Sequence, residues 1–261
     1  MAPRRPLLEI ACFNPESALI AAKGGADRIE LCQDYQSGGL SPPPQVLAAL
    51  KSQLSIPVYV MIRPHSKSFC YDDSEFRDMK STMSTLNNAG ADGFVFGILN
   101  PESLNAPLKE TSWIDIARNK ELVQLANGRP CTFHRAFDLI PESLWDHALA
   151  DIMECGFKYI LTNGGPSGSK ALECVDKLAD LVHRLATCPG ETLPSKGVVP
   201  EIIVGGGVRS QNAGLLWTDT SASFFHSAAL LQDAEIVSEE EVKSLRRTLD
   251  TAWKGHVKSS S

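Results

Sequence analysis

The chain has 261 residues, 43% of them hydrophobic, and carries a formal net charge of −6 with a pI near 5.5. Such a composition supports a large core, and without a basic stripe on the chain we exclude nucleic acid as a partner. No stretch approaches the roughly 18 apolar residues of a membrane helix, and Glu9 interrupts the apolar run after the basic start too early for a secretory signal.

Short runs of strand-forming residues alternate with helix-like stretches from one end of the chain to the other. The strand-like runs begin near residues 7, 28, 58, 93, 132, 159, 202 and 224. Helix-like stretches follow them, for example at 15–23, 42–54, 75–89 and 141–155. A small residue (Gly25, Gly90, Gly156 or Ser221) precedes every second strand, and these residues are 65, 66 and 65 positions apart. Prolines introduce the other strands.

Regular β–α alternation predicts a parallel sheet, and eight units in about 250 residues fit a single (β/α)8 barrel. The open doubly wound sheet is the alternative, but Cys12-Phe13-Asn14-Pro15 lacks the glycine-rich turn that such folds carry after the first strand. We therefore expect one domain over 1–261, with a core at about 7–254, a surface loop at 187–199 and a flexible tail at 255–261.

Charged side chains recur in strands that should be almost purely apolar in a barrel covered by helices. Glu9, Glu30 and Arg63 lie in or just after the first three strands, and a second group follows the later strands: His134, Arg135, Asp138, Thr162 and His226. A lone buried charge costs several kcal/mol unless it is paired, so we expect these groups to converge at the carboxyl ends of the strands. Two carboxylates at matching depth, Glu9 and Glu30, would repel, so that one takes up a proton or both pair with Arg63. The alternative is an ion network that only fills the barrel.

Bare glycines after the later strands suggest a place for an anion. Gly205-Gly206-Gly207 ends the seventh strand, Thr162-Asn163-Gly164 ends the sixth, and His226-Ser227-Ala228 ends the eighth. Backbone N–H groups exposed by glycine can approach an oxyanion or phosphate, although sharp turns need glycine in any case.

The seven cysteines are an odd number without a Cys-x-x-Cys pair, which indicates reduced thiols and a cytoplasmic protein. Cys12 and Cys32 fall late in neighbouring strands, and soft sulfur ligands favour Cu(I). Cys32 shares a face with Glu30, whereas Cys12 is three residues beyond Glu9 and so faces the other way unless the strand has ended. The alternative is that both are small buried hydrophobic residues.

Several of these segments together resemble the CutC copper homeostasis family. They are Leu8-Glu9-Ile10-Ala11-Cys12, Gly24 to Cys32, Ile62-Arg63-Pro64, Phe69-Cys70-Tyr71, Thr132 to Asp138 and Leu161-Thr162-Asn163-Gly164. The resemblance runs from about Leu7 to Ala229. It implies a cytoplasmic barrel, dimeric or larger, that is associated with copper tolerance and binds Cu(I) through cysteine. It also implies the polar residues named above as the pocket, and Cys32 with Cys12 as thiol ligands.

One loop departs from the family pattern, because His65-Ser66-Lys67-Ser68 stands where the family usually has Arg-Gly-Gly-Asp. The role of that aspartate is therefore in doubt here. Asn163 also stands where serine is common.

Three functional hypotheses remain open at this stage. The first is a homeostasis protein that binds Cu(I). The second is a barrel enzyme with lyase- or isomerase-like acid–base chemistry on a small anionic or sugar-like molecule, in which Glu9, Glu30, Arg63, His134 and Asp138 act on the substrate and Arg135, Thr162, Asn163, Gly206, Gly207, His226 and Ser227 bind it. The third is a scaffold in which the charges serve stability alone. The fold itself favours none of them.

Overall fold

The computed structural model describes residues 4–105, 112–187, 199–231 and 235–259. The surface loop expected at 187–199 lies almost entirely outside these residues. Eight parallel strands form a closed barrel in chain order, with β8 pairing back onto β1. The strands are β1 (Leu7–Cys12), β2 (Arg28–Leu31), β3 (Val58–Met61), β4 (Gly93–Phe96), β5 (Cys131–Phe133), β6 (Tyr159–Thr162), β7 (Glu201–Val204) and β8 (Phe224–Ser227). The predicted barrel is thus confirmed.

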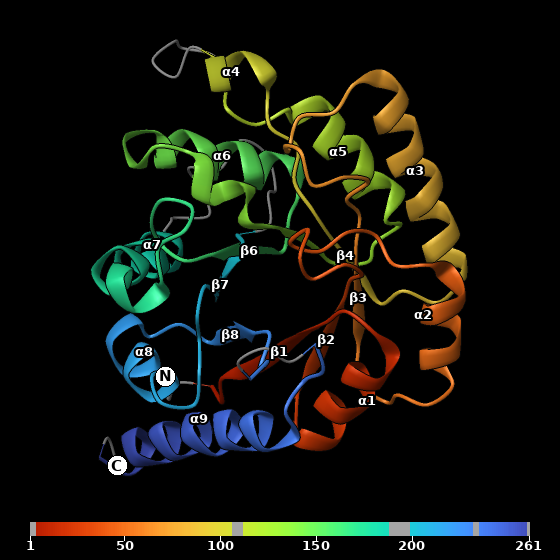
Figure 1. Cartoon of the computed structure of the whole chain (residues 1–261). Coiled ribbons are helices and arrows are strands. Elements are labelled where there is room, and N and C mark those ends of the chain that lie inside the picture. The colour runs from red at the N-terminus through yellow and green to blue at the C-terminus, as the bar shows by residue number, and fades with distance from the viewer. Residues whose placement is uncertain (1–3, 106–111, 188–198, 232–234, 260–261) are drawn as a thin grey trace.

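Helices surround the barrel, as Figure 1 shows. The α-helices are α1 (Pro15–Gly24), α2 (Pro44–Lys51), α3 (Asp73–Asn88), α4 (Pro101–Asn105), α5 (Ile116–Leu125), α6 (Trp145–Cys155), α7 (Val175–Thr187), α8 (Ala213–Thr220) and α9 (Glu239–Ser259). Three short 3-10 helices, η1 (Arg135–Leu139), η2 (Glu142–Leu144) and η3 (Ala171–Cys174), lie in the connections. None of the helices in the described part of the chain has the length and apolar character that a bilayer-spanning segment needs.

Helix boundaries follow from local chemistry. Helix α1 starts after Asn14, whose side chain accepts the N–H of Ser17, and ends at Gly25 in the left-handed conformation at φ 98°. Helix α3 carries a capping box in which Asp72 and Glu75 satisfy each other's free N–H groups. The glycine signals seen in the sequence, Gly25, Gly90 and Gly156, therefore mark the turns that lead into β2, β4 and β6.

Strand residues alternate between two cores. Outward side chains such as Leu8, Ile10 and Phe94 pack under the helices in one large cluster. The core inside the barrel is smaller than this outer cluster. It holds aromatic side chains near the amino ends of the strands, where a Cβ added at Gly93 would come within 2.6 Å of the Tyr59 ring. These rings fill the barrel interior near the amino ends of the strands.

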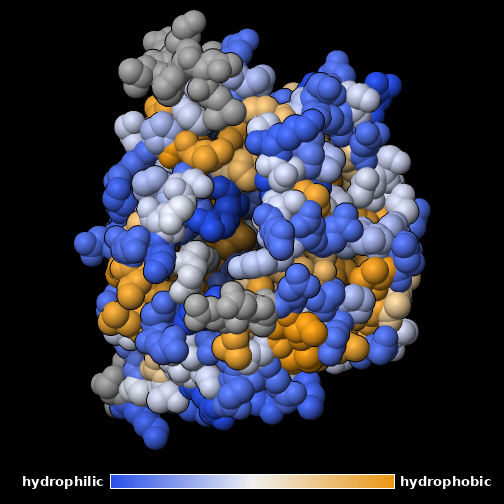
Figure 2. Space-filling view, viewed as in Figure 1, coloured by the Kyte–Doolittle hydropathy of each residue, from blue (hydrophilic) through white to orange (hydrophobic). Residues whose placement is uncertain are grey.

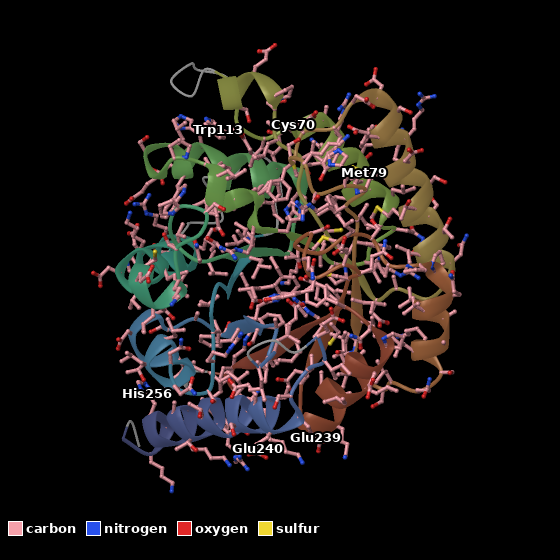
Figure 3. All side chains as sticks on the ribbon, viewed as in Figure 1. Cys70, Met79, Trp113, Glu239, Glu240 and His256 are labelled. Atoms are coloured by element: carbon pink, nitrogen blue, oxygen red, sulfur yellow. The ribbon has the colours of Figure 1, made fainter. Side chains whose placement is uncertain are left out.

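The C-terminal helix differs from the expected flexible tail at 255–261. Helix α9 continues to Ser259, and Figure 3 labels His256 in its last turns. There the His256 ring meets Trp217 of α8 edge-on at a centroid distance of 5.7 Å. At its other end Glu239 forms an ion pair with Lys23 of α1 at 3.0 Å. Tertiary contacts thus hold a segment that composition alone marks as loose.

Candidate functional site

A cavity of about 380 Å³ opens at the carboxyl ends of the strands. Figure 2 shows the molecule hollowed near the middle of the visible face, with hydrophilic residues beside the hollow. Nine of the residues singled out in the sequence line the cavity: Glu30, Cys32, Arg63, His134, Arg135, Gly206, Gly207, His226 and Ser227. The others, Glu9, Asp138, Thr162, Asn163 and Cys12, are not among its lining residues.

Glu9 lies beneath the cavity, in a buried ion pair with Arg28. The Arg28 Nε donates to Glu9 Oε2 at 2.5 Å, and the side chains are 5% and 0% exposed. Burial alone would raise the pKa of Glu9, but Arg28 and His226 outweigh it and lower that pKa to about 2. Glu9 is therefore an anion, and its contacts with Arg28 and His226 stabilise the base of the site.

The Arg28 guanidinium lies among aromatic rings of the barrel interior. Its central carbon is 3.9 Å from the ring centroid of Tyr59, 4.2 Å from Phe224 and 4.7 Å from Tyr159. A desolvated cation over aromatic faces is stabilised by the ring quadrupoles. Arg28 thus joins the charged layer above it to the aromatic layer below it.

Glu30 and His226 form the charged layer of the cavity wall. His226 Nδ1 is 2.8 Å from Glu9 Oε1 and 3.8 Å from Glu30 Oε2. Burial favours neutral imidazole, yet the two carboxylates raise the pKa of His226. The pKa of Glu30 is raised by burial and by Glu9, against the opposing effect of His226. The pKa values of the two carboxylates thus shift in opposite directions, down for Glu9 and up for Glu30.

The prediction that Arg63 pairs with the two carboxylates was wrong. The sequence interpretation gave Arg63 this place, but Arg28 pairs with Glu9, because the strand register sets Glu9 level with Arg28 and Ala11 level with Glu30. The two carboxylates therefore do not lie at matching depth. Arg63 comes after the end of β3 and turns to the loop after β2, where its Nη1 donates to the carbonyls of Ser37, Gly38 and Gly39, each at 3.2 Å.

The loop that departs from the family pattern also contacts Arg63. Ser66 offers its carbonyl to Arg63 Nη2 at 3.4 Å, and His65 Nε2 lies 3.0 Å from Glu75 Oε1 at the start of α3. The Arg63 guanidinium also covers the Phe69 ring at 4.8 Å. Backbone carbonyls of two loops therefore hold the Arg63 guanidinium.

Asp138, Thr162 and Asn163 lie behind the cavity wall. Asp138 Oδ1 accepts the Thr162 hydroxyl at 2.6 Å and the Asn163 N–H at 3.2 Å, while Oδ2 accepts Arg135 Nε at 2.7 Å. Thr162 follows Leu161, which lines the cavity, so alternation along β6 turns Thr162 outward. In this structure these three residues position Arg135 and the turn after β6, and none of them meets the cavity directly.

The two candidate thiols face different cores. Cys32 lines the cavity, and its Sγ donates to Glu30 Oε1 at 3.3 Å. Cys12 belongs to the outer cluster, where its Sγ donates to the Ile10 carbonyl at 3.5 Å. Burial, followed by the nearby carboxylates, raises the pKa of both thiols well above the ordinary value. The alternation argument thus places only Cys32 at the site.

The glycine turn after β7 lines the cavity. Gly206 and Gly207 have φ values of 89° and 80°, which side chains rarely adopt, and a Cβ on Gly206 would come within 2.7 Å of Asn163 Cβ. Arg209 follows them and lines the cavity, with its Nη1 donating to the Ser227 hydroxyl at 3.0 Å. The backbone of Gly206 and Gly207 and the Arg209 guanidinium therefore lie together at the mouth of the cavity.

Two residues of this site escaped the sequence interpretation as functional groups: Arg28 and Arg209. Arg28 alternates with Glu30 on one strand, a spacing that already puts both side chains inside the barrel. Arg209 stands two residues after the glycines, outside any strand-like run.

One group of potential metal donors occurs in the described part of the chain. A donor atom from each of Glu9, Glu30 and His226 lies within 4.8 Å of the other two. Carboxylate and imidazole suit a harder cation than Cu(I). Because Glu9 is already paired with Arg28, this trio is better described as an ion network than as a ready metal cage.

Comparison with known proteins gives the family. The CutC family model matches residues 6–231. The crystal structure of a putative copper homeostasis protein CutC from Streptococcus agalactiae is similar, with a TM-score of 0.74 and 28% sequence identity over 85% of this chain and 98% of that chain.

More distant barrels share only the fold. Phosphoribosyl anthranilate isomerase from Thermotoga maritima matches with a TM-score of 0.58 and 12% identity over 94% of this chain and 99% of that chain. Thiamine phosphate pyrophosphorylase from Pyrococcus furiosus gives 0.56 and 14%, over 95% and 97%. At such identities the likeness concerns the fold alone.

Proposed function

The chain belongs to the CutC family, and we propose that it acts in copper homeostasis and copper tolerance as a cytoplasmic protein that binds Cu(I) at the mouth of its barrel. Family membership and the similarity to the Streptococcus agalactiae protein support the copper role. The six cysteines in the described residues are all free, which fits a reducing compartment.

The observation that carries the copper site is the position of Cys32 on the cavity wall. Cys32 packs in one small cluster with Met61, and both side chains line the cavity. Thiolate and thioether are the soft donors that select Cu(I) over harder cations. These donors fit Cu(I), with the imidazole of His226 as a further nitrogen on the same wall.

Binding through Cys32 requires loss of its proton. The thiol is buried, its pKa is raised, and it donates to Glu30. Metal binding has to displace that proton, so affinity should increase with pH. Cys12, named as a ligand by the family resemblance, faces the outer core and is not part of the set that we propose.

Anaerobic competition titrations with a chromogenic Cu(I) chelator test this function. Wild type should bind one Cu(I) per chain, and Cys32→Ser should weaken binding by at least about tenfold. Cys131→Ser is the matched control, because Cys131 is also buried but lies in the outer cluster. Equal binding by wild type and Cys32→Ser would exclude Cys32 as the ligand, and loss of binding in Cys12→Ser instead would move the site to the outer core.

The proposed assembly is a homodimer or larger oligomer, as the family resemblance implies. Light scattering coupled to size exclusion measures it directly. A mass equal to a single 28.3 kDa chain at micromolar concentration would contradict it.

A further inference from the structure

His134 presents an unusual hydrogen-bond donor to the cavity. It follows β5 and caps η1, where its Nδ1 accepts the Ala136 N–H at 3.3 Å. A ring nitrogen that accepts carries no proton, so the proton of the neutral ring is on Nε2. The Nε2 atom is buried and has no partner among the described residues, while the side chain lines the cavity. A ligand in the cavity is the natural partner of that N–H.

The surroundings keep this ring neutral. Burial and the nearby charge of Arg63 lower the pKa of His134 to about 3. The Phe69 ring meets it edge-on at a centroid distance of 4.6 Å and holds its orientation. At neutral pH the ring is therefore a positioned N–H donor, which can polarise a carbonyl oxygen without giving up its proton.

Glu30 offers a matching acceptor on the same cavity. Its Oε1 accepts the Cys32 thiol, whereas Oε2 is buried and makes no hydrogen bond in the described part of the chain. The nearest cationic group to Oε2 is His226, at 3.8 Å. Two residues that line one cavity thus carry an unpartnered buried donor and an unpartnered buried acceptor.

Positive charge at the mouth indicates the kind of ligand. Arg63 and Arg209 line the cavity, and neither has a carboxylate within 4.0 Å among the residues that the structure describes. Arg135 also lines it, but is paired with Asp138. Two guanidinium groups without acidic partners, beside the bare backbone of Gly206 and Gly207, favour an anion. A volume of about 380 Å³ accommodates a small metabolite.

From this arrangement we propose that the cavity catalyses proton transfer at the carbon next to the carbonyl group of a small anionic carbonyl compound. His134 Nε2–H donates to the carbonyl oxygen, Glu30 Oε2 takes the proton, and Arg63 and Arg209 hold the phosphate or carboxylate. This activity lies beyond the proposed copper role and needs no metal.

The step balances without a co-reactant. The C–H bond breaks, its electron pair forms the carbon–carbon double bond of an enolate, and the carbonyl π pair moves to the oxygen that His134 stabilises. Glu30 then holds the proton as a carboxylic acid. Return of that proton to the same carbon gives exchange or epimerisation. In a substrate with a hydroxyl group on that carbon, return of the proton to the former carbonyl carbon gives isomerisation, while the hydroxyl proton moves to the oxygen of the former carbonyl and a new carbonyl forms in its place. Oxidation and reduction cancel within the substrate.

Proton NMR in D₂O on chelator-treated protein tests the proposal without knowledge of the product. The probes are dihydroxyacetone phosphate and pyruvate, two anionic carbonyl compounds with exchangeable C–H bonds, and neutral dihydroxyacetone. Wild type should replace C–H by C–D in one of the anionic probes well above the protein-free rate, and the neutral probe should exchange at least about tenfold more slowly. The arm that responds tells whether phosphate or carboxylate is the anion.

Substitutions separate catalysis from folding. Glu30→Gln and His134→Ala should each lower the exchange rate by about 100-fold or more, while His134→Gln, which keeps an N–H donor, should retain more activity than His134→Ala. Glu121→Gln, at an exposed ion pair with Lys80, is the control for an acid-to-amide change. Thermal unfolding verifies that each variant folds, and if Glu30→Gln does not fold, the two His134 variants decide.

Two results would overturn the proposal. One is wild-type protein that exchanges neither anionic probe above background. The other is exchange by folded His134→Ala or folded Glu30→Gln at the wild-type rate. Neither result bears on Cu(I) binding, which is measured separately.

Discussion

The pair between Arg28 and Glu9 makes the sharpest prediction about stability. In Arg28→Met the buried carboxylate of Glu9 loses its main cation, while the apolar part of the side chain keeps its place among Tyr59, Tyr159 and Phe224. The substitution therefore tests the charge of Arg28 separately from the packing of its side chain. Glu9 keeps one further partner, His226 at 2.8 Å.

The magnitude follows from the pKa of Glu9. Its ordinary value of 4.5 falls to about 2 in the folded protein, a difference worth about 3 kcal/mol at roughly 1.4 kcal/mol per unit. Removing one partner of a buried pair costs a similar amount, about 3–5 kcal/mol. Because the folded pKa lies below the unfolded one, this stabilisation is present above about pH 4.5 and is lost as the pH falls towards 2.

Urea unfolding at pH 7 and pH 3 measures both effects. At pH 7, Arg28→Met should lower the free energy of unfolding by about 3 kcal/mol, and the difference from wild type should shrink at pH 3. Adding Glu9→Gln to Arg28→Met should recover much of the loss, because no unpaired charge remains buried. Lys80→Met, which breaks an exposed pair with Glu121, is the control and should cost at most about 1 kcal/mol. A loss below about 1 kcal/mol for Arg28→Met at pH 7 would refute the reasoning.

Other substitutions test the turns around the cavity. Asp138→Asn should cost about 1–3 kcal/mol in urea unfolding, because it weakens the buried contacts to Thr162 and Arg135; an unchanged free energy would mean that these contacts do not brace the turn. Gly206→Ala should lower the melting temperature clearly more than Gly168→Ala, since both positions have positive φ but only Gly206 lacks room for a Cβ; equal shifts would refute the packing argument. Asp72→Ala removes the cap of α3 and should cost about 1 kcal/mol by thermal unfolding, and a neutral result would contradict the capping box.

Periodicity made the architecture predictable from the sequence. Repeats of 65 and 66 residues, with glycine before strands β2, β4 and β6, located the barrel because local turn chemistry and alternation require no knowledge of distant contacts. Alternation also placed Cys32 inside and Cys12 outside. The extent of α9 was missed, since the contact between His256 and Trp217 joins segments that are far apart in the sequence.

The partners inside the site were less predictable, because they depend on the stagger between neighbouring strands. Residue counting set Glu9 level with Glu30, whereas the register sets it level with Arg28. The same limit applies beyond the strand ends. Asp138 and Asn163 were predicted as site residues, but η1 and the turn after β6 place them behind the cavity wall. The sequence therefore predicted at which end of the barrel the charged residues gather, but not which of them pair with one another.

The two proposed roles depend on the same few atoms. Cys32 Sγ lies 3.3 Å from Glu30 Oε1, so a metal held by the thiolate would replace that hydrogen bond and lie beside the carboxylate that we assign to proton transfer. The Glu30 carboxylate cannot lie beside a bound metal and also keep the position in which it receives a proton from the substrate carbon. Cu(I) and a small anionic molecule should therefore exclude each other from the cavity. A link between copper and metabolism would then need no second site, because occupancy of Cys32 by metal would itself block the chemistry at Glu30.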